Sequence, residues 1–102
     1  MAELIEIARV VVIADTQLEK ILLAEFIKMG AKGYNCSYCT GKGRHESVDD
    51  VFNGNKRVRI EVLARPHLAA AILEYMHKKQ FGSYPAAAFM DTVEVDSRDT
   101  FF

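Results

Sequence analysis

The 102-residue sequence predicts a single α+β domain in which a strand, a helix and a strand occur twice in succession. Two observations lead to this prediction. Short β-branched segments alternate along the chain with longer segments whose apolar residues recur every three or four positions. Half of the residues are hydrophobic and 26% are charged, which is the ordinary balance of one folded domain. The chain is therefore expected to bury one modest core.

The first predicted strand and helix occupy the opening third of the chain. Arg9–Ala14 is a β-branched run bounded by polar residues, which is typical of a buried strand. Thr16 and Glu19 then have the spacing of a helix capping box, and apolar residues recur at helical intervals as far as Met29. Gly30 follows directly, and glycine is the usual residue just beyond the end of a helix.

The second predicted strand covers residues 32–40. Tyr34, Cys36 and Tyr38 alternate along it, so all three are expected on one face of the sheet. Two helices cover only one face of such a sheet, and these side chains are expected on the uncovered face. An apolar face of that size favours a partner, and self-association into a closed ring is the simplest arrangement.

Cys36 and Cys39 form a Cys-x-x-Cys pair within this strand. A redox-active pair of this type belongs at the N-terminus of a helix, where the thiolate is stabilised. Residues three apart on a strand point to opposite faces, so neither a disulfide nor a shared metal ion is expected. The three histidines have no metal-ligand spacing either, and no metal site is predicted.

Residues 41–56 are predicted as a mobile loop, because three glycines and several charged residues lie there without a regular apolar pattern. Hairpin loops usually need about two to five residues, and one about three times longer is more often functional or disordered. Arg57–Leu63 follows as the third strand. Its residues Arg57, Arg59 and Glu61 are expected on one face, opposite two valines and an isoleucine.

The second helix is predicted to begin at Pro66, which suits a first helical turn, and to run to Lys79. Gly82 is expected to stop it. Residues 84–95 form the fourth predicted strand, and residues 96–102 form a short tail. The complete order is that of a ferredoxin-like βαββαβ sandwich with a long loop between its second and third strands.

The charge and hydropathy of the chain argue against several classes of protein. The formal net charge is −1, from 13 Lys and Arg against 14 Asp and Glu, which argues against a nucleic-acid-binding protein with a basic footprint. The longest apolar runs fall far short of the ~20 residues that a membrane span needs. No secretory signal is visible at the N-terminus, so a cytoplasmic protein is expected.

Cationic side chains gather at both ends of the long loop. At its start two glycines let the backbone approach a ligand with its amides turned inward. At its end, guanidinium groups can grip a phosphate or carboxylate with paired hydrogen bonds. A solvated turn, with surface arginines balanced by a glutamate, is the alternative interpretation; convergence of the two ends favours a site for a small anion. The candidate residues are Gly41, Lys42, Gly43, Arg44, Arg57, Arg59 and Glu61.

The turn before the fourth strand supplies further candidates. Phe81 and Tyr84 carry rings that could stack on a base, and Gly82 allows a ligand to approach closely. Core packing is the simpler interpretation for Phe81. The binding candidates in this turn are therefore Gly82, Ser83 and Tyr84.

With these residues placed, the chain resembles the PII-like signalling proteins over about residues 8–95. Within them it is most similar to the branch associated with carboxysomes and bicarbonate transport. No single segment is diagnostic, but the order and spacing of four segments together are fairly specific. They are Gly30-Ala31-Lys32-Gly33-Tyr34, Thr40-Gly41-Lys42-Gly43, Arg59-Ile60-Glu61-Val62-Leu63 and Phe81-Gly82-Ser83-Tyr84.

The resemblance implies a trimer that holds an adenine nucleotide in each cleft between neighbouring subunits. Residues 41–43 would line the phosphates, Arg57 and Arg59 would pair with anionic groups, and the turn at residues 82–84 would lie near the nucleotide. The branch implies ADP or AMP ahead of ATP, with bicarbonate as a second anion and no other cofactor. Ordering of the loop would then report the ligand state to a protein target in bicarbonate uptake or carboxysome function.

Two other functions fit the same residues. One is a small phosphohydrolase of the acylphosphatase type, in which Arg57 or Arg59 would hold phosphate. It ranks lower because no serine stands in a context typical of a catalytic nucleophile, so an enzyme is not expected. The other is a structural trimer of the metal-tolerance type, in which the long loop only packs.

Overall fold

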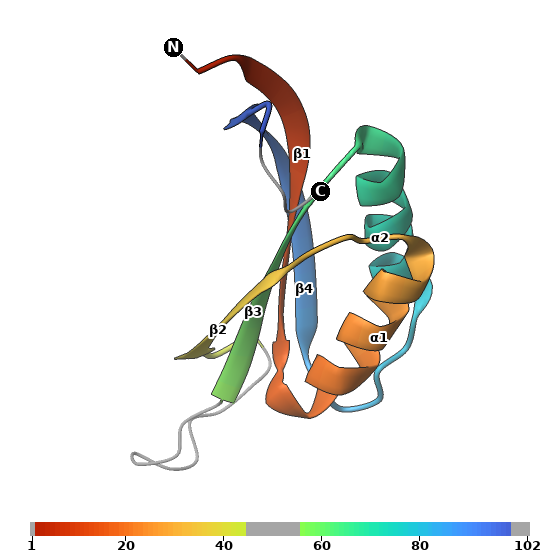
Figure 1. The fold of residues 1–102 in the computed structure, drawn as a ribbon. Helices are drawn as coiled ribbons and strands as arrows, with labels where there is room; N and C mark the ends of the chain where they lie inside the picture. Colours follow the sequence, from red (N-terminus) through yellow and green to blue (C-terminus); the bar gives the residue numbers. More distant parts are fainter. Residues whose placement is uncertain (1, 45–55, 99–102) are drawn as a thin grey trace.

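A four-stranded antiparallel sheet carries both helices on one of its faces (Figure 1). The computed structural model describes residues 2–44 and 56–98, and its element order confirms the predicted α+β, ferredoxin-like fold. The strand order in the sheet is β2-β3-β1-β4. The elements are β1 (Leu4–Asp15), a 3-10 turn (Thr16–Leu18), α1 (Glu19–Met29), β2 (Asn35–Thr40), β3 (Lys56–Ala64), α2 (Pro66–Lys78) and β4 (Ala86–Asp96).

The core lies between the sheet and the two helices. β1 pairs with β3 on one side and with β4 on the other, and Val10 lies opposite Val62 of β3. Because side chains alternate along a strand, Val10 and its even-numbered neighbours face the helices. There they pack with Leu22 and Phe26 of α1 and with Ile72 of α2, none of which is more than 1% exposed. Burying one such side chain contributes about 1.5–3 kcal/mol, so this cluster is a major source of stability.

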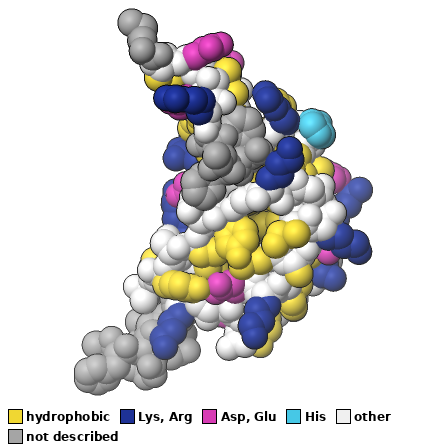
Figure 2. All heavy atoms as spheres, viewed as in Figure 1, with side chains coloured by type: hydrophobic (Ala, Val, Ile, Leu, Met, Phe, Trp, Pro, Cys, Tyr) yellow, Lys and Arg dark blue, Asp and Glu magenta, His cyan; other side chains and the backbone are white. Residues whose placement is uncertain are grey.

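Some of the large apolar side chains lie at the surface. Figure 2, which has the viewpoint of Figure 1, shows hydrophobic side chains gathered near the middle of this side of the molecule, with Lys and Arg side chains around its margin. Large apolar side chains that are more than half exposed include Ile21 and Ile27 of α1 and Tyr38 of β2. The hydrophobic residues of the chain are therefore not confined to its core.

The start of α1 differs from the capping box that the sequence predicts at Thr16 and Glu19. The chain first forms a 3-10 turn that is capped by Asp15, whose carboxylate accepts a hydrogen bond from the Gln17 amide at 2.8 Å. No described side chain caps the start of α1 itself. The prediction is wrong because the aspartate caps the chain one residue earlier than the threonine would.

The two helices end differently. Gly30 ends α1 as predicted: its φ of 118° is left-handed, and its amide donates to the carbonyl oxygens of Phe26 and Ile27. α2 ends at Lys78, before the glycine that was expected to stop it. Gly82 has a φ of 65° and lies in the turn that follows, so its conformational freedom serves the turn rather than the helix.

All four strands differ from their predicted starts, β3 by only one residue because it begins at Lys56. β1 begins at Leu4 rather than at Arg9, because residues 4–8 pair with the last residues of β4. β2 begins at Asn35 and β4 at Ala86, each a little after the predicted start. The extension of β1 lengthens the sheet at the end that carries the start of α2.

Parts of two predicted segments lie outside the described residues. These are residues 45–55 of the predicted loop and residues 99–102 of the predicted tail. The start of the tail is held beside β1, because the Ser97 amide donates to the Glu3 carbonyl oxygen at 2.8 Å. Within residues 2–44 and 56–98, neither helix is long and apolar enough to cross a membrane.

Cys36 and Tyr38 lie on the opposite face of the sheet from the predicted one. Cys36 is paired with Ile60 and Tyr38 with Val58, and both partners are core residues that face the helices. The Tyr38 hydroxyl also donates to the Glu19 carboxylate of α1 at 2.8 Å. The prediction is wrong because alternation fixes only which residues share a face, whereas the pairing with β3 decides which face that is.

We expect two substitutions on α1 to differ widely in their effect on the free energy of unfolding, because one removes a core side chain and the other an exposed one. Phe26→Ala should lower the free energy of unfolding by about 3–5 kcal/mol, because it leaves a cavity against α2 and the sheet. Ile21→Ala should change it by less than about 1 kcal/mol, because Ile21 is 55% exposed. Urea denaturation followed by circular dichroism at one protein concentration measures both. Equal losses for the two variants would contradict this account of the core.

Candidate functional site

The base of the long loop and the turn before β4 both lie at one end of the sheet, here called the loop end. β1 ends there at Asp15 and β2 at Thr40, while β3 starts there at Lys56 and β4 at Ala86. The long loop therefore leaves and re-enters the sheet at this end, and the turn before β4 lies there too (Figure 1). One end of the molecule carries both predicted parts of the site.

An open groove of about 500 Å³ lies at the loop end, beside the base of the loop. Lys56 and Arg57 supply its basic groups, and Thr40 adds a hydroxyl group. All three groups donate hydrogen bonds, and phosphate and carboxylate oxygens accept them. The lining therefore contains groups of the kind that bind anions, although Arg57 is only 6% exposed and its guanidinium donates to the Lys56 carbonyl oxygen at 3.4 Å. Its lining residues are Thr16, Tyr38, Cys39, Thr40, Lys56 and Arg57.

The start of the loop packs against the start of β3. A Cβ placed on Gly41 would lie 3.8 Å from the Arg57 Cγ, which is an ordinary packing distance. The Lys42 ammonium donates to the Gly43 carbonyl oxygen at 3.3 Å, and Arg44 is exposed. The structure brings Gly41 and Arg57 together, whereas a shared pocket that includes Lys42 and Arg44 stays a prediction.

Arg57, Arg59 and Glu61 share the face of β3 that points away from the helices, here called the outer face. Arg57 is only 6% exposed. The Arg59 guanidinium pairs with the Glu61 carboxylate at 3.2 Å, and it lies 6.0 Å from the centre of the Phe89 ring. Arg59 is therefore paired with a glutamate, as in the alternative interpretation of the sequence, in which surface arginines are balanced by a glutamate.

The turn at residues 82–84 lies apart from the base of the loop within one chain. β1 separates β3 from β4, and neighbouring strands are about 4.8 Å apart, so the turn lies roughly 10 Å or more from β3. Phe81 packs against Tyr75 with ring centres 6.4 Å apart and contacts the core, which favours the packing interpretation for this ring. Tyr84 is 45% exposed, so a ligand can reach its ring.

A second hollow, of about 230 Å³, lies on the outer face away from the loop end. Glu61, a predicted site residue, lines it together with three polar residues that the sequence analysis did not single out as site residues, Arg9, Asn35 and Glu94. Arg9 was detectable as the charged first residue of the predicted strand Arg9–Ala14, whose other residues are apolar. The lining residues are Arg9, Gly33, Tyr34, Asn35, Glu61, Leu63, Val93, Glu94 and Val95.

An ion pair between β1 and β4 fixes Arg9 beside this hollow. The Arg9 guanidinium donates to both oxygens of the Asp91 carboxylate, at 3.0 and 2.6 Å. The hydrogen bond and the charge of Asp91 raise the pKa of Arg9, and the same hydrogen bond lowers the pKa of Asp91. Both groups are therefore charged at neutral pH, and the pair ties β1 to β4 across the outer face.

The two cysteines lie on opposite faces of β2, as the alternation predicts. Cys36 is opposite Ile60 and Cys39 is opposite Arg57, and both are free thiols. Burial raises the pKa of the Cys36 thiol, which lowers its reactivity at neutral pH. Within the described part of the chain, no group of three or more His, Cys, Asp and Glu residues is placed to hold a metal ion.

The sequence matches one family model, described as nitrogen regulatory protein P-II, over residues 7–99. No curated protein sequence matches the chain at a comparable level. The matched range contains every strand and helix of the described residues except the first residues of β1. The agreement therefore concerns the whole fold rather than one motif.

Several solved structures share the fold. A PII-like signalling protein from Thermus thermophilus is 28% identical, with a TM-score of 0.76 over 92% of this chain and 93% of that one. CPII from Thiomonas intermedia, bound to ADP, AMP and bicarbonate, is 19% identical, with a TM-score of 0.78 over 94% and 93%. The GlnK–ATP complex of B. subtilis is 15% identical, with a TM-score of 0.65 over 86% and 84%.

The Arg9–Asp91 pair predicts a pH-dependent loss of stability. Because the folded-state pKa of Asp91 is lowered, its contribution is present above the unfolded pKa of about 3.9 and is lost as the pH falls through the folded value. Asp91→Asn should therefore lower the urea midpoint at pH 7, and this difference should begin to shrink below about pH 4 and vanish only below the lowered folded-state pKa of Asp91. Glu74→Gln, which removes an exposed pair with Lys78 on α2, is the control and should show little change at either pH. A constant difference across the range would contradict the assigned cause.

Proposed function

The chain belongs to the nitrogen regulatory protein P-II family, and we propose that it is a cytoplasmic regulatory sensor of adenine nucleotides rather than an enzyme. The observation that carries the proposal is the closeness of Gly41, at the start of the long loop, to the Arg57 side chain, at its end, beside an open groove lined by basic and hydroxyl groups. A bound phosphate would be held by both ends of the loop. Its binding would therefore act directly on the conformation of the loop.

The proposed ligands are ADP or AMP ahead of ATP, with bicarbonate as a second anion. Guanidinium groups suit both, because they bind phosphate and carboxylate-like oxygens with two parallel hydrogen bonds. The Thiomonas protein that was solved with ADP, AMP and bicarbonate has the same fold over nearly the whole chain, which supports this choice. The B. subtilis protein, which was solved with ATP, supports nucleotide binding by a protein of this fold.

A complete nucleotide site would need a second copy of the chain. The loop base and the turn at residues 82–84 are separated by β1 within one chain. If a neighbouring subunit placed its own turn against this loop base, Gly82 would allow close approach and Tyr84 could stack on the adenine. The cleft between subunits would then join Gly41, Lys42, Gly43, Arg44, Arg57, Arg59 and Glu61 of one subunit to Gly82, Ser83 and Tyr84 of the next.

The outer face is the proposed surface for this self-association. No helix of the described residues covers it, and Phe89 is 45% exposed there beside Val93 and Val95 of the same strand. Apolar surface of this kind favours association, and closed rings are the usual result for identical chains. The number of three subunits rests on the resemblance to the PII-like proteins.

The proposed output is a change in the loop at residues 41–56. A nucleotide that binds one loop conformation better than others shifts the population toward it, and a protein target can read that shift. The resemblance to the carboxysome and bicarbonate-transport branch makes a target in inorganic-carbon metabolism the proposed partner. Neither a nucleic acid nor insertion into a membrane has a part in this scheme.

Calorimetry tests the ligand. ADP and AMP should bind in the micromolar range, ATP more weakly, and bicarbonate should change the heat of nucleotide binding. Arg59→Gln should weaken ADP roughly tenfold to a hundredfold, because a charge-assisted hydrogen bond is lost. Lys28→Gln, on an exposed site of α1 away from the loop end, is the control and should bind normally.

The same samples separate the alternatives. Absence of heat with every adenine nucleotide would overturn the sensor proposal. Turnover of an acyl phosphate that disappears in Arg59→Ala would instead favour the phosphohydrolase. Protease cleavage within the loop that no ligand alters would favour the purely structural trimer.

Light scattering tests the assembly. The wild-type chain should have the mass of a trimer, three times 11.5 kDa. Phe89→Glu should yield smaller species, because it places charges in an apolar interface on the outer face. Met90→Glu is a matched control, since Met90 is the next residue of β4, is 46% exposed and points to the other face. Dissociation of both variants alike, or a monomeric wild type, would contradict the proposed surface.

A further inference from the structure

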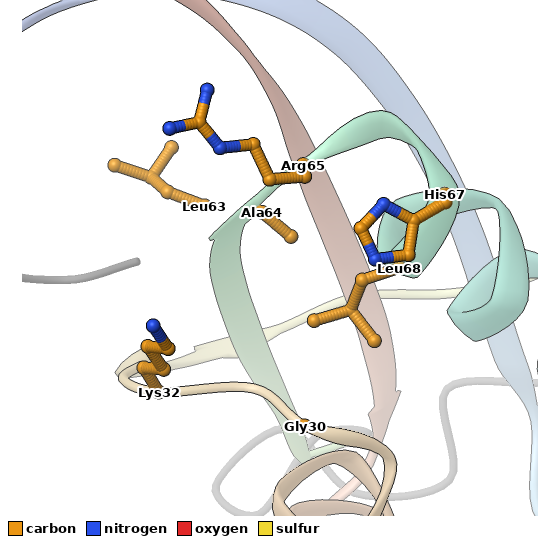
Figure 3. Close-up of a pocket in the computed structure, with 7 residues that line it drawn as sticks. All are labelled: Gly30, Lys32, Leu63, Ala64, Arg65, His67 and Leu68. Carbon is orange, nitrogen blue, oxygen red and sulfur yellow. The ribbon is translucent and has the colours of Figure 1, made fainter.

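A separate cavity of about 300 Å³ lies at the far end of β3 from the loop end, here called the α2 cavity (Figure 3). It lies between the end of β3, the first turn of α2 and the chain that leaves α1. Because β3 rises about 3.3 Å per residue, its nine residues put this cavity more than roughly 20 Å from the groove at the loop end. The lining residues are Gly30, Lys32, Leu63, Ala64, Arg65, His67 and Leu68.

The polar side chains that line the α2 cavity in the described structure are all basic. Lys32 comes from the segment after α1, Arg65 from the residue before α2, and His67 from the first turn of α2. No carboxylate of the described residues lines the cavity. In Figure 3 the Lys32 amino group points from its own segment toward the side where Leu63 and Arg65 lie. Two separate segments, the chain after α1 and the start of α2, therefore bring basic groups to one hollow in a chain whose net charge is −1.

The start of α2 adds to the positive potential of the cavity. α2 has 13 residues, its first residue is Pro66, no described side chain caps it, and its first turn holds no acidic residue. A helix N-terminus carries a partial positive charge that acidic or capping side chains usually offset. Here that charge adds to the basic side chains of Arg65 and His67, so the cavity favours an anion.

The remaining wall of the cavity is apolar. Leu63 and Leu68 are partly buried, and Ala64 is only 2% exposed. A volume of about 300 Å³ is at the lower end of the range for small-molecule sites and leaves room beside a phosphate or carboxylate for several carbon atoms. The combination of a basic rim and an apolar wall suits an organic anion better than an inorganic one.

We propose that the α2 cavity binds a small organic anion, with its phosphate or carboxylate group among Lys32, Arg65 and His67 and its hydrocarbon part against Leu63 and Leu68. This site lies beyond the proposed nucleotide site. Among the described residues it shares none with the groove at the loop end, and the sheet hollow that contains Arg9 meets it only at Leu63.

Amide chemical shifts of the full-length protein test this proposal, with butyl phosphate and butyrate as probes. Both should give saturable shifts at the amides of residues 31–33 and 67–69, with millimolar dissociation constants. Inorganic phosphate should bind several-fold more weakly than butyl phosphate, and butanol should give no saturable shift. The more tightly bound of the two organic probes identifies the preferred head group.

Three variants separate the α2 cavity from other surfaces. Lys32→Gln should weaken butyl phosphate at least about fivefold, because it removes one charge-assisted hydrogen bond. Lys20→Gln, at the other end of α1, and Arg59→Gln, on the outer face, should leave the constant unchanged. Unaltered shifts elsewhere in the Lys32→Gln spectrum show that the variant is folded.

Four results would overturn the proposal. They are no saturable shift at these amides, equal binding of inorganic and butyl phosphate, an unchanged constant in Lys32→Gln, and loss of binding in Arg59→Gln. The last result would place the probe at the nucleotide site instead. Failure of ADP to bind in calorimetry leaves the expected result here unchanged, so the two proposals fail independently.

Discussion

The pairing of β1 with β3 and β4 is the constraint on which the rest of the structure depends. β1 is an inner strand of the sheet, and alternation sends its side chains to the core and to the outer face in turn. A shift of the register by one residue would put Arg9 into the core and Val10 on the outer face. The same register places Arg9 opposite Asp91, so the core and the ion pair that joins β1 to β4 are fixed together.

The fold was predictable because its signals are local and repeated. The β-branched runs, the helical apolar periods and Gly30 each specify a short segment, and their order leaves few topologies. The failures come from competition between neighbouring groups. Asp15 and Thr16 can both cap the same turn, and the aspartate does so by accepting from the Gln17 amide. The sequence pattern does not rank these two residues.

The parts of the site that escaped prediction depend on contacts between distant segments. The sequence shows that Cys36 and Tyr38 share a face, but only the pairing with β3 places them toward the helices. Arg9 looked like the boundary of a strand, yet the extension of β1 to Leu4 puts it inside the sheet. Gly41 and Arg57 were chosen as candidates from their positions at the two ends of one loop, and the pairing of β2 with β3 brings them close together.

The ion pair between Arg59 and Glu61 affects the free energy of nucleotide binding. A phosphate that takes the Arg59 guanidinium must displace the Glu61 carboxylate, which now accepts from it at 3.2 Å. Both side chains are about one-third exposed, and pairs of this exposure contribute only about 0–1 kcal/mol. A phosphate that accepts two hydrogen bonds from the guanidinium contributes more free energy than the lost ion pair did. The released carboxylate then becomes an acceptor for a ligand hydroxyl. The ion pair therefore fixes the position of the Arg59 side chain, yet a phosphate can replace the Glu61 carboxylate. The buried Arg57 side chain, in contrast, stays in position on β3.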